Sequence, residues 1–216
     1  MTLEKIDTLK RIAGDVSRET FEQLLYFEQQ FLNWNHSINL ASASSAEQVW
    51  ARHILDSAQL VPIAPAARNW LDIGSGGGFP GAIVAILLRD QPDVSVHLVE
   101  SNRKKAAFLT KIIGETGAPA IVHAKRIETV DGQLKNIEIV TARAVASLTD
   151  LLRMTKPWLG SGARALFQKG REYKAEIEES RVDWSFDLII HDSRTDQDGA
   201  ILEIFNLRPL HDQPEM

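Results

Sequence analysis

The chain has no cysteine among its 216 residues. Without thiols it can form neither a disulfide framework nor a thiolate zinc site, and it has no cysteine nucleophile. It also lacks any apolar run near the roughly 18 residues that a membrane-spanning helix needs. Its N-terminal segment mixes charged residues throughout and has no apolar core, so it does not resemble a signal peptide. These absences lead us to expect a cytoplasmic protein with no membrane partner.

Several catalytic signatures are missing as well. The six histidines show no metal-ligating spacing such as His-Glu-x-x-His, so we expect no metal site. No Gly-x-Ser-x-Gly segment of a serine hydrolase occurs. No Gly-Lys-Ser/Thr follows the glycine-rich segment at 74–81, which excludes a Walker-type phosphate loop.

The formal net charge of −5 is unevenly distributed along the chain. Residues 103–174 hold 14 Lys and Arg against 6 Asp and Glu, whereas residues 175–216 hold 3 against 11. A basic middle segment between acidic ends is typical of a protein that presents one face to a polyanion such as a nucleic acid. A chance fluctuation scattered over the surface would give the same counts, so charge alone leaves both interpretations open.

The first 68 residues have the spacing of helices. After Ser17, apolar residues recur every three or four positions as far as Trp34, which predicts one long helix. Ser44 and Glu47 form a capping-box pattern that predicts the start of a second helix. The inner side of that helix carries Val49, Trp50, Ile54 and Leu55. We therefore expect a helical extension over residues 1–68, packed on a second part over residues 69–216.

From residue 69 onward, strands and helices alternate. The expected strands are 70–73, 94–99, 120–123, 138–141, 163–168, 186–191 and 201–207. The expected helices between them are 80–89, 103–114, 148–154 and 173–179. Nearly continuous apolar strands in this alternation are typical of a parallel sheet that helices cover on both faces. The polar, acidic segment 193–199 predicts that the last two strands form an antiparallel hairpin.

A glycine-rich segment, LDIGSGGGFPG at 71–81, joins the first of these strands to its helix. Glycines let the backbone turn sharply and let a ligand approach without a Cβ in the way. The next strand ends at Glu100, whose carboxylate could accept hydrogen bonds from both hydroxyls of a ribose. Strand, glycine loop, helix and acid in this order predict a nucleoside-containing cofactor at the carboxyl ends of the first two strands.

The loop matches two cofactor patterns. Residues 76–81 give the G-x-G-x-x-G fingerprint of dinucleotide sites, and residues 72–78 give the D-x-G-x-G-x-G pattern typical of S-adenosylmethionine sites. Pro80 removes a backbone amide that a pyrophosphate would use, and Asp72 brings a negative charge that suits a sulfonium and an amino group better. We therefore favour S-adenosylmethionine as the cofactor and keep an NAD(P)-dependent oxidoreductase as the alternative.

The sequence resembles the ribosomal small-subunit methyltransferase G family, also called GidB, in segments that occur in the family's order between about residues 30 and 170. The matching segments are Trp34-Asn35, Ile38-Asn39-Leu40, Arg52-His53-Ile54-Leu55-Asp56-Ser57, Asp72–Gly81, Glu100-Ser101, Lys104-Lys105, Phe108-Leu109, Arg126-Ile127-Glu128, Ala142-Arg143-Ala144 and Lys169-Gly170. One departure is Ala142, where the family more usually has serine.

The resemblance implies an α/β fold of the class I S-adenosylmethionine-dependent methyltransferases, with a Rossmann-like, seven-stranded, mostly parallel sheet and an N-terminal helical extension. The implied activity is methyl transfer to N7 of a guanine in 16S ribosomal RNA, in the decoding-region loop of the small subunit. The implied partner is 16S ribosomal RNA or the small ribosomal subunit, and we expect a monomer. An alternative of another class is a non-catalytic RNA-binding factor of ribosome assembly that has kept a cofactor-shaped loop.

Carried over position by position, the resemblance also assigns a cofactor site. Its residues would be Asp72, Gly74, Gly76, Phe79, Glu100, Ile127, Glu128 and Arg143. Gly74 and Phe79 would line the pocket, Gly76 would hold the turn and Glu100 would hold the ribose. Ile127 and Glu128 would lie beside the adenine, and Arg143 would close the site near the methionine end or the incoming guanine.

Guanine N7 carries a free lone pair, so its methylation needs no general base. We therefore predict no catalytic acid or base and a positioning role for Arg143. His53 and Asp56, three residues apart on one helix, could brace the loop, although for His53 a hydrogen bond at the helix end is favoured. The basic residues expected to meet RNA, with plain solvation as the alternative, are Arg103, Lys104, Lys105, Lys125, Arg126 and Lys169.

Overall fold

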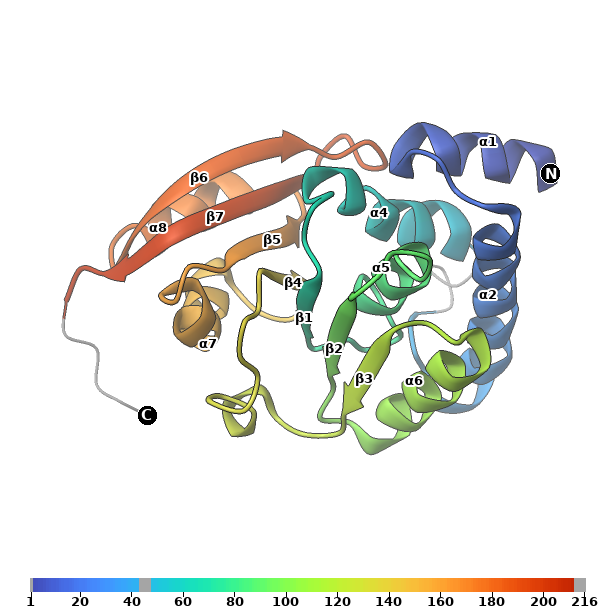
Figure 1. Ribbon diagram of the computed structural model, residues 1–216. Helices are drawn as coiled ribbons and strands as arrows, with labels where there is room; N and C mark the ends of the chain where they lie inside the picture. The colour runs from blue at the N-terminus through green and yellow to red at the C-terminus, as the bar shows by residue number, and fades with distance from the viewer. Residues whose placement is uncertain (1, 43–47, 212–216) are drawn as a thin grey trace.

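A seven-stranded β-sheet runs through the centre of the molecule, in the strand order β3-β2-β1-β4-β5-β7-β6 (Figure 1). The computed structural model describes residues 2–42 and 48–211. The strands are β1 (Asn69–Ile73), β2 (Ser95–Val99), β3 (Ala120–His123), β4 (Ile139–Arg143), β5 (Arg164–Lys169), β6 (Trp184–Asp192) and β7 (Ala200–Pro209). Strands β1 to β5 pair in parallel, and β7 is antiparallel to both β5 and β6. The expected fold class is confirmed.

Helices cover both faces of the sheet. They are α1 (Thr2–Ala13), α2 (Arg18–Ile38), η1 (Trp50–Ile54), α4 (Leu55–Ala58), η2 (Val61–Ile63), α5 (Gly81–Leu87), α6 (Arg103–Thr116), η3 (Ile127–Thr129), α7 (Leu148–Leu159) and α8 (Tyr173–Ser180). Alternation along β1 divides the core between the two faces, because Trp70 joins the cluster under α5 and α6 while Leu71 joins the cluster under α7.

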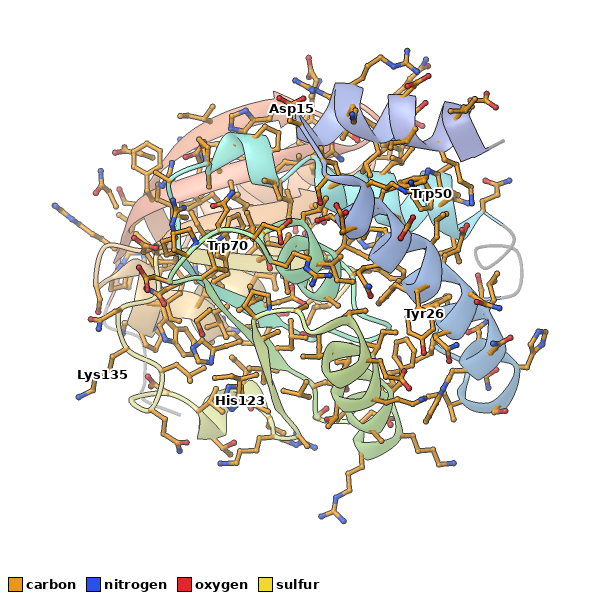
Figure 2. All side chains as sticks on the ribbon, turned by 45° about the vertical axis from the view of Figure 1, so that its right-hand side comes forward. Asp15, Tyr26, Trp50, Trp70, His123 and Lys135 are labelled. Carbon is orange, nitrogen blue, oxygen red and sulfur yellow. The ribbon has the colours of Figure 1, made fainter. Side chains whose placement is uncertain are left out.

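The N-terminal helices pack on the face that carries α5 and α6. Side chains from α1 and α2 and from α5 and α6 form one buried cluster. Tyr26 lies between α2 and α6 in Figure 2, and Trp50 lies beside α1, where the Lys5 Nζ is 4.6 Å from its ring centre. The strand β1 starts at Asn69, the residue at which the expected second part begins.

The long helix expected after Ser17 is confirmed as α2, and the Ser17 hydroxyl oxygen accepts a hydrogen bond from the Thr20 N–H at 3.1 Å. The helix α1 was not distinguished by the sequence. Ser44 and Glu47, the expected capping box, lie outside the described residues. The segment that follows them is not a regular α-helix but begins with a π-helical turn, η1, although the predicted burial of Val49, Trp50, Ile54 and Leu55 is confirmed.

The expected strands all form, with ends that differ by a few residues. Helix α7 extends beyond the expected end at 154 as far as Leu159, past Pro157 inside the helix. Trp158 and Leu159 are buried in the core, and this apolar contact outweighs the loss of one helical hydrogen bond at the proline.

The expected hairpin is confirmed in β6 and β7, and the turn between them, residues 193–199, reaches the N-terminal helices (Figure 1). The Arg194 guanidinium donates to the carbonyl oxygens of Arg11 and Ile12 in the last turn of α1, at 3.3 and 3.4 Å. The β6–β7 turn therefore contacts the end of α1, and it also contacts α4 through the hydrogen bond from the Thr195 hydroxyl to the Asp56 carboxylate. Within the described parts of the chain, no helix is both long and apolar enough to cross a membrane.

Candidate active site

The loop between β1 and α5 turns sharply at the carboxyl edge of the parallel strands. Gly74, Gly76 and Gly78 have φ angles of 66°, 53° and 96°, in the left-handed region that favours glycine. A Cβ added at Gly76 would meet no atom closer than the Gly74 carbonyl oxygen, at 3.7 Å. The concave side of the turn is therefore open to a ligand.

Asp72 lies beneath this loop and holds it from inside the protein. Its carboxylate accepts a hydrogen bond from the Thr141 hydroxyl at 2.7 Å and from the Gly81 N–H at 3.2 Å. The side chain is fully buried, and this desolvation raises the pKa of Asp72 to about 6, although the hydrogen bonds from Thr141, Ser75 and Gly81 oppose the rise. Asp72 thus fixes the loop and the start of α5 without facing the solvent.

Glu100 joins the end of β2 to the same loop. One carboxylate oxygen accepts from the Gly76 N–H at 2.8 Å, and the other accepts from the Asn102 N–H at 2.6 Å. Each oxygen can accept a second hydrogen bond, so the carboxylate remains able to bind a pair of hydroxyls. Ile127 and Glu128 belong to η3, which follows β3, the strand next to β2; Ile127 is half-buried and Glu128 is exposed.

Phe79, at the end of the loop, faces an aromatic cluster and two polar groups. Its ring packs against Phe27 and Phe31, with ring centres 5.5 and 5.1 Å away. The His53 ring stacks on it at 4.9 Å, and the Arg143 guanidinium lies 5.1 Å from its ring centre. The loop is thereby fastened to α2 and η1 of the N-terminal extension.

Arg143 ends β4 at the carboxyl edge of the sheet, and its side chain turns toward η1 and α4. The guanidinium donates to the Arg52 carbonyl oxygen and to the Asp56 carboxylate, both at 3.1 Å. Its Nη2 lies 2.8 Å from the Nδ1 of His53. The side chain is 17% exposed, so the alternative of an open surface salt bridge does not describe it.

His53 contacts the site and is not limited to a helix-end hydrogen bond, which corrects the interpretation favoured from sequence. Burial, together with the smaller effect of the positive charges of Arg143 and Arg52, lowers the pKa of His53 to about 4. A neutral imidazole results, which can accept a hydrogen bond from the arginine.

Beside Arg143 the structure has a cavity of about 760 Å³. Its walls come from η1 and α4, the ends of β4 and β5, and the turn between β6 and β7. Gln168, Gln59 and Thr195 line it and were not identified from the sequence, because neither a motif nor a charge marks them. The cavity opens at the carboxyl edge of β4 and β5, and two residues of its wall, His53 and Arg143, contact Phe79 at the end of the glycine loop.

The chain matches the family described as GidB, rRNA small subunit methyltransferase G, over residues 20–201. It is also 52% identical over 210 residues to a ribosomal RNA small subunit methyltransferase G of Chelativorans sp. (strain BNC1), covering 97% of this chain and 100% of that protein. The protein of the same name from Brucella anthropi is 54% identical over 204 residues, covering 94% of this chain and 96% of its own. This chain belongs to the GidB family.

Solved structures of other methyltransferases share the fold of this GidB member. An O-methyltransferase from Bacillus cereus in complex with SAH has a TM-score of 0.58 at 16% identity, covering 84% of this chain and 91% of that one. The O-methyltransferase TomG from Streptomyces achromogenes, in complex with SAM, has a TM-score of 0.56 at 17% identity, covering 88% and 91%. At these identities the likeness concerns the fold alone.

The residues of this GidB chain fit a methyl donor that carries an adenosine. The open turn at Gly76 leaves room for a ligand against the backbone, and the Glu100 carboxylate has acceptor capacity for a ribose. A pyrophosphate fits less well. Pro80 has no N–H, and the Gly81 N–H at the start of α5 is already bound to Asp72.

The predicted RNA-binding residues fall into two groups. Arg103, Lys104, Lys125 and Arg126 are exposed and Lys105 is half-buried, in the first turn of α6 and the segment after β3. Lys169 differs from the surface role expected for it, because its side chain is 8% exposed, pairs with Glu176 at 2.6 Å and donates to the Ala146 carbonyl oxygen. It lies in the wall of the cavity.

Proposed function

We propose that this chain transfers the methyl group of S-adenosylmethionine to N7 of a guanine in 16S ribosomal RNA. The observation that carries the proposal is the pairing of an open glycine turn with Glu100, in a chain of the GidB family. Within that site, Gly74, Gly76 and Phe79 would line the donor pocket and Glu100 would hold the ribose. Ile127 and Glu128 would flank the adenine, and Asp72 would act from beneath by holding the loop.

The donor supplies a methyl group on a sulfonium, which the N7 lone pair attacks directly. No proton has to be removed from N7, so the protein's contribution is alignment of the two reacting atoms. Arg143 lies between the glycine loop and the cavity, with part of its donor set unused by its three hydrogen bonds. We assign it the task of orienting either the methionine end of the donor or the guanine.

The cavity beside Arg143 has the size of a small-molecule site and would receive the guanine, lifted from its RNA stack. The exposed basic residues Arg103, Lys104, Lys125 and Arg126, with Lys105 beside them, would bind phosphates of the surrounding RNA. Lys169, in the cavity wall, would act on the base side of the RNA and not on the outer backbone. We place the reaction in the cytoplasm and expect a monomer.

The proposal is tested by incubating the protein with labelled S-adenosylmethionine and small subunits that lack the modification. The RNA is then cleaved chemically at 7-methylguanine, and the position of the cleavage is mapped. Label at a single guanine is the expected result. Absence of label in naked 16S RNA and in subunits alike would overturn the proposal.

Two further measurements distinguish the alternatives. S-adenosylhomocysteine should raise the melting temperature and NAD should not, whereas an oxidoreductase would show the reverse. A non-catalytic assembly factor would be unaffected in its function by Gly76→Asp. We expect this substitution, which adds a side chain at a φ of 53° inside the turn, to abolish methylation while RNA binding persists.

A further inference from the structure

Asp56 is the meeting point of four side chains that come from different parts of the fold. One carboxylate oxygen accepts from the Gln59 amide and from the Thr195 hydroxyl, both at 2.7 Å. The other accepts from the Gln168 amide at 2.7 Å and from Arg143 at 3.1 Å. The Asp56 side chain is 16% exposed, so these contacts are largely shielded from water.

The segment that supplies Thr195 is itself fixed to the N-terminal extension. The Arg194 N–H donates to the side-chain oxygen of Gln59 at 3.0 Å, and the Arg194 guanidinium reaches the end of α1. The Ser193 hydroxyl oxygen accepts from the Thr195 and Asp196 N–H groups at 3.3 and 3.2 Å. The turn between β6 and β7 is therefore held where the Thr195 hydroxyl meets Asp56.

Two donors on one oxygen of Asp56 fix the plane of its carboxylate, which then directs the other oxygen toward Arg143. A carboxylate held only through its second oxygen, by Gln168 and Arg143, could rotate about that oxygen, and the guanidinium could move with it. Arg143 lies at the border between the glycine loop and the cavity, where a displacement of about 1 Å can cost up to about a hundredfold in rate.

We propose that Asp56 is a positioning residue for Arg143, and that the β6–β7 turn takes part in catalysis by holding Asp56 through the hydroxyl of Thr195. This inference rests on the proposed function, since Arg143 acts there on the methyl donor or the guanine. It assigns the acidic turn, which contains no sequence motif, a defined role in the reaction.

The test compares Thr195→Val with Thr195→Ser in the full-length protein. Valine keeps the shape of threonine and removes the hydroxyl, while serine restores the hydroxyl. We expect Thr195→Val to lower kcat for RNA methylation by about tenfold and Thr195→Ser to stay within about twofold of the wild type. Asp56→Asn should lower kcat at least as far as Thr195→Val. In Thr195→Val the dissociation constant of S-adenosylhomocysteine should stay within about twofold of the wild-type value. The glycine loop and Glu100, which are proposed to bind this ligand, lie outside the network around Asp56.

A matched control lies in the same turn. Asp198 is exposed and pairs with Arg171 at 2.9 Å, and we expect Asp198→Asn to leave kcat unchanged. Equal kcat losses in Thr195→Val and Asp198→Asn would overturn the inference, because they would indicate a general loosening of the turn. Unchanged kcat in Thr195→Val, or failure of Thr195→Ser to rescue it, would overturn it as well.

A readout without catalysis keeps this inference separate from the proposed function. The side-chain nitrogen and Cζ resonances of Arg143, assigned by their loss in Arg143→Lys, should shift and broaden in Thr195→Val but not in Thr195→Ser or Asp198→Asn. Unmoved Arg143 resonances in Thr195→Val would refute the coupling even if the wild type methylated no RNA. An inactive wild type with moved resonances would refute the proposed function and keep the coupling.

Discussion

The Nη2 of Arg143 lies 2.8 Å from the Nδ1 of His53, and arginine can only donate, so the histidine nitrogen accepts. That arrangement requires a neutral imidazole with its proton on Nε2. It joins the end of a central strand to the N-terminal extension, directly above the ring of Phe79.

We expect His53 to titrate near pH 4 and to stay neutral at pH 7. Desolvation lowers its pKa most, and the charges of Arg143 and Arg52 add to the effect. Histidine NMR in a pH series measures the pKa and the tautomer, with His53→Gln for assignment. The variant Arg143→Gln should raise the pKa of His53, because it removes one of the two repelling charges. An unshifted midpoint in Arg143→Gln would contradict this account.

Asp72 makes the stability of the protein depend on pH, in the direction opposite to the effect of His53. Its pKa rises from 3.8 to about 6 on folding, so the native state binds more protons than the unfolded state between those values. The stability that Asp72 contributes is therefore full below pH 4 and decreases as the pH rises toward 6. Compared with Asp72→Asn, the wild type should lose up to about 3 kcal/mol of its free energy of unfolding as the pH rises through this window.

Urea unfolding of both proteins, in steps of roughly half a pH unit from about pH 3.5 to about pH 7, measures the difference between their free energies of unfolding. His53 acts in an overlapping window, and its lowered pKa makes stability increase with pH. Comparison with Asp72→Asn cancels that contribution, because both proteins contain His53. A flat difference between the two curves would show that Asp72 keeps an ordinary pKa in the fold.

Gly81 and Gly114 provide a matched pair for the packing of the loop. A Cβ at Gly81 would lie 2.6 Å from the Asp72 Cβ and would also collide with Leu98, whereas a Cβ at Gly114 would meet no atom within 4 Å. We expect Gly81→Ala to destabilise the protein by about 1–3 kcal/mol and to weaken S-adenosylhomocysteine binding. Gly114→Ala, in the exposed interior of α6, should stabilise it by about 0.5–1 kcal/mol. Thermal melts and calorimetry measure both, and similar effects of the two changes would be inconsistent with the close contact at Gly81.

The sheet and the loop could be predicted because their signals are local. Each strand is predicted by an apolar run, and the loop by its glycines and the acid after β2, all within short segments of the sequence. The strands formed within a few positions of where they were expected. The π-helical turn at Trp50–Ile54 could not be found this way. Its sequence has ordinary helical spacing, and the contact made within this turn, from Arg143 to the Arg52 carbonyl oxygen, comes from a strand 91 residues away.

The network around Asp56 was missed for a different reason. Gln168 and Thr195 lie 112 and 139 residues after Asp56 in the chain, so only the tertiary fold brings them together. Lys169 shows the same limit, because the sequence gives its charge but not its burial beside Glu176. Predictions from the sequence were sound where one segment contains the whole pattern, and incomplete where a site is assembled from several segments.

The exposed basic residues at the start of α6 can be tested by the salt dependence of RNA binding. Arg103 and Lys104 occupy the first turn of α6, where positive charge opposes the helix dipole, so the helix itself does not favour them there. If each contacts one phosphate, the double variant Arg103→Gln/Lys104→Gln should bind the RNA substrate more weakly. The fall of log K with log salt should also become less steep, by about 2 in the slope.

The control for this pair is Lys156→Gln/Lys174→Gln, which removes the same charge from exposed positions on α7 and α8, on the other face of the sheet. Its salt slope should equal that of the wild type, and binding of S-adenosylhomocysteine should be unaffected in both double variants. Filter binding at a series of salt concentrations measures the slopes. Equal changes in the two double variants would mean that RNA responds only to net charge, and the RNA surface would then have to be sought elsewhere than at the start of α6.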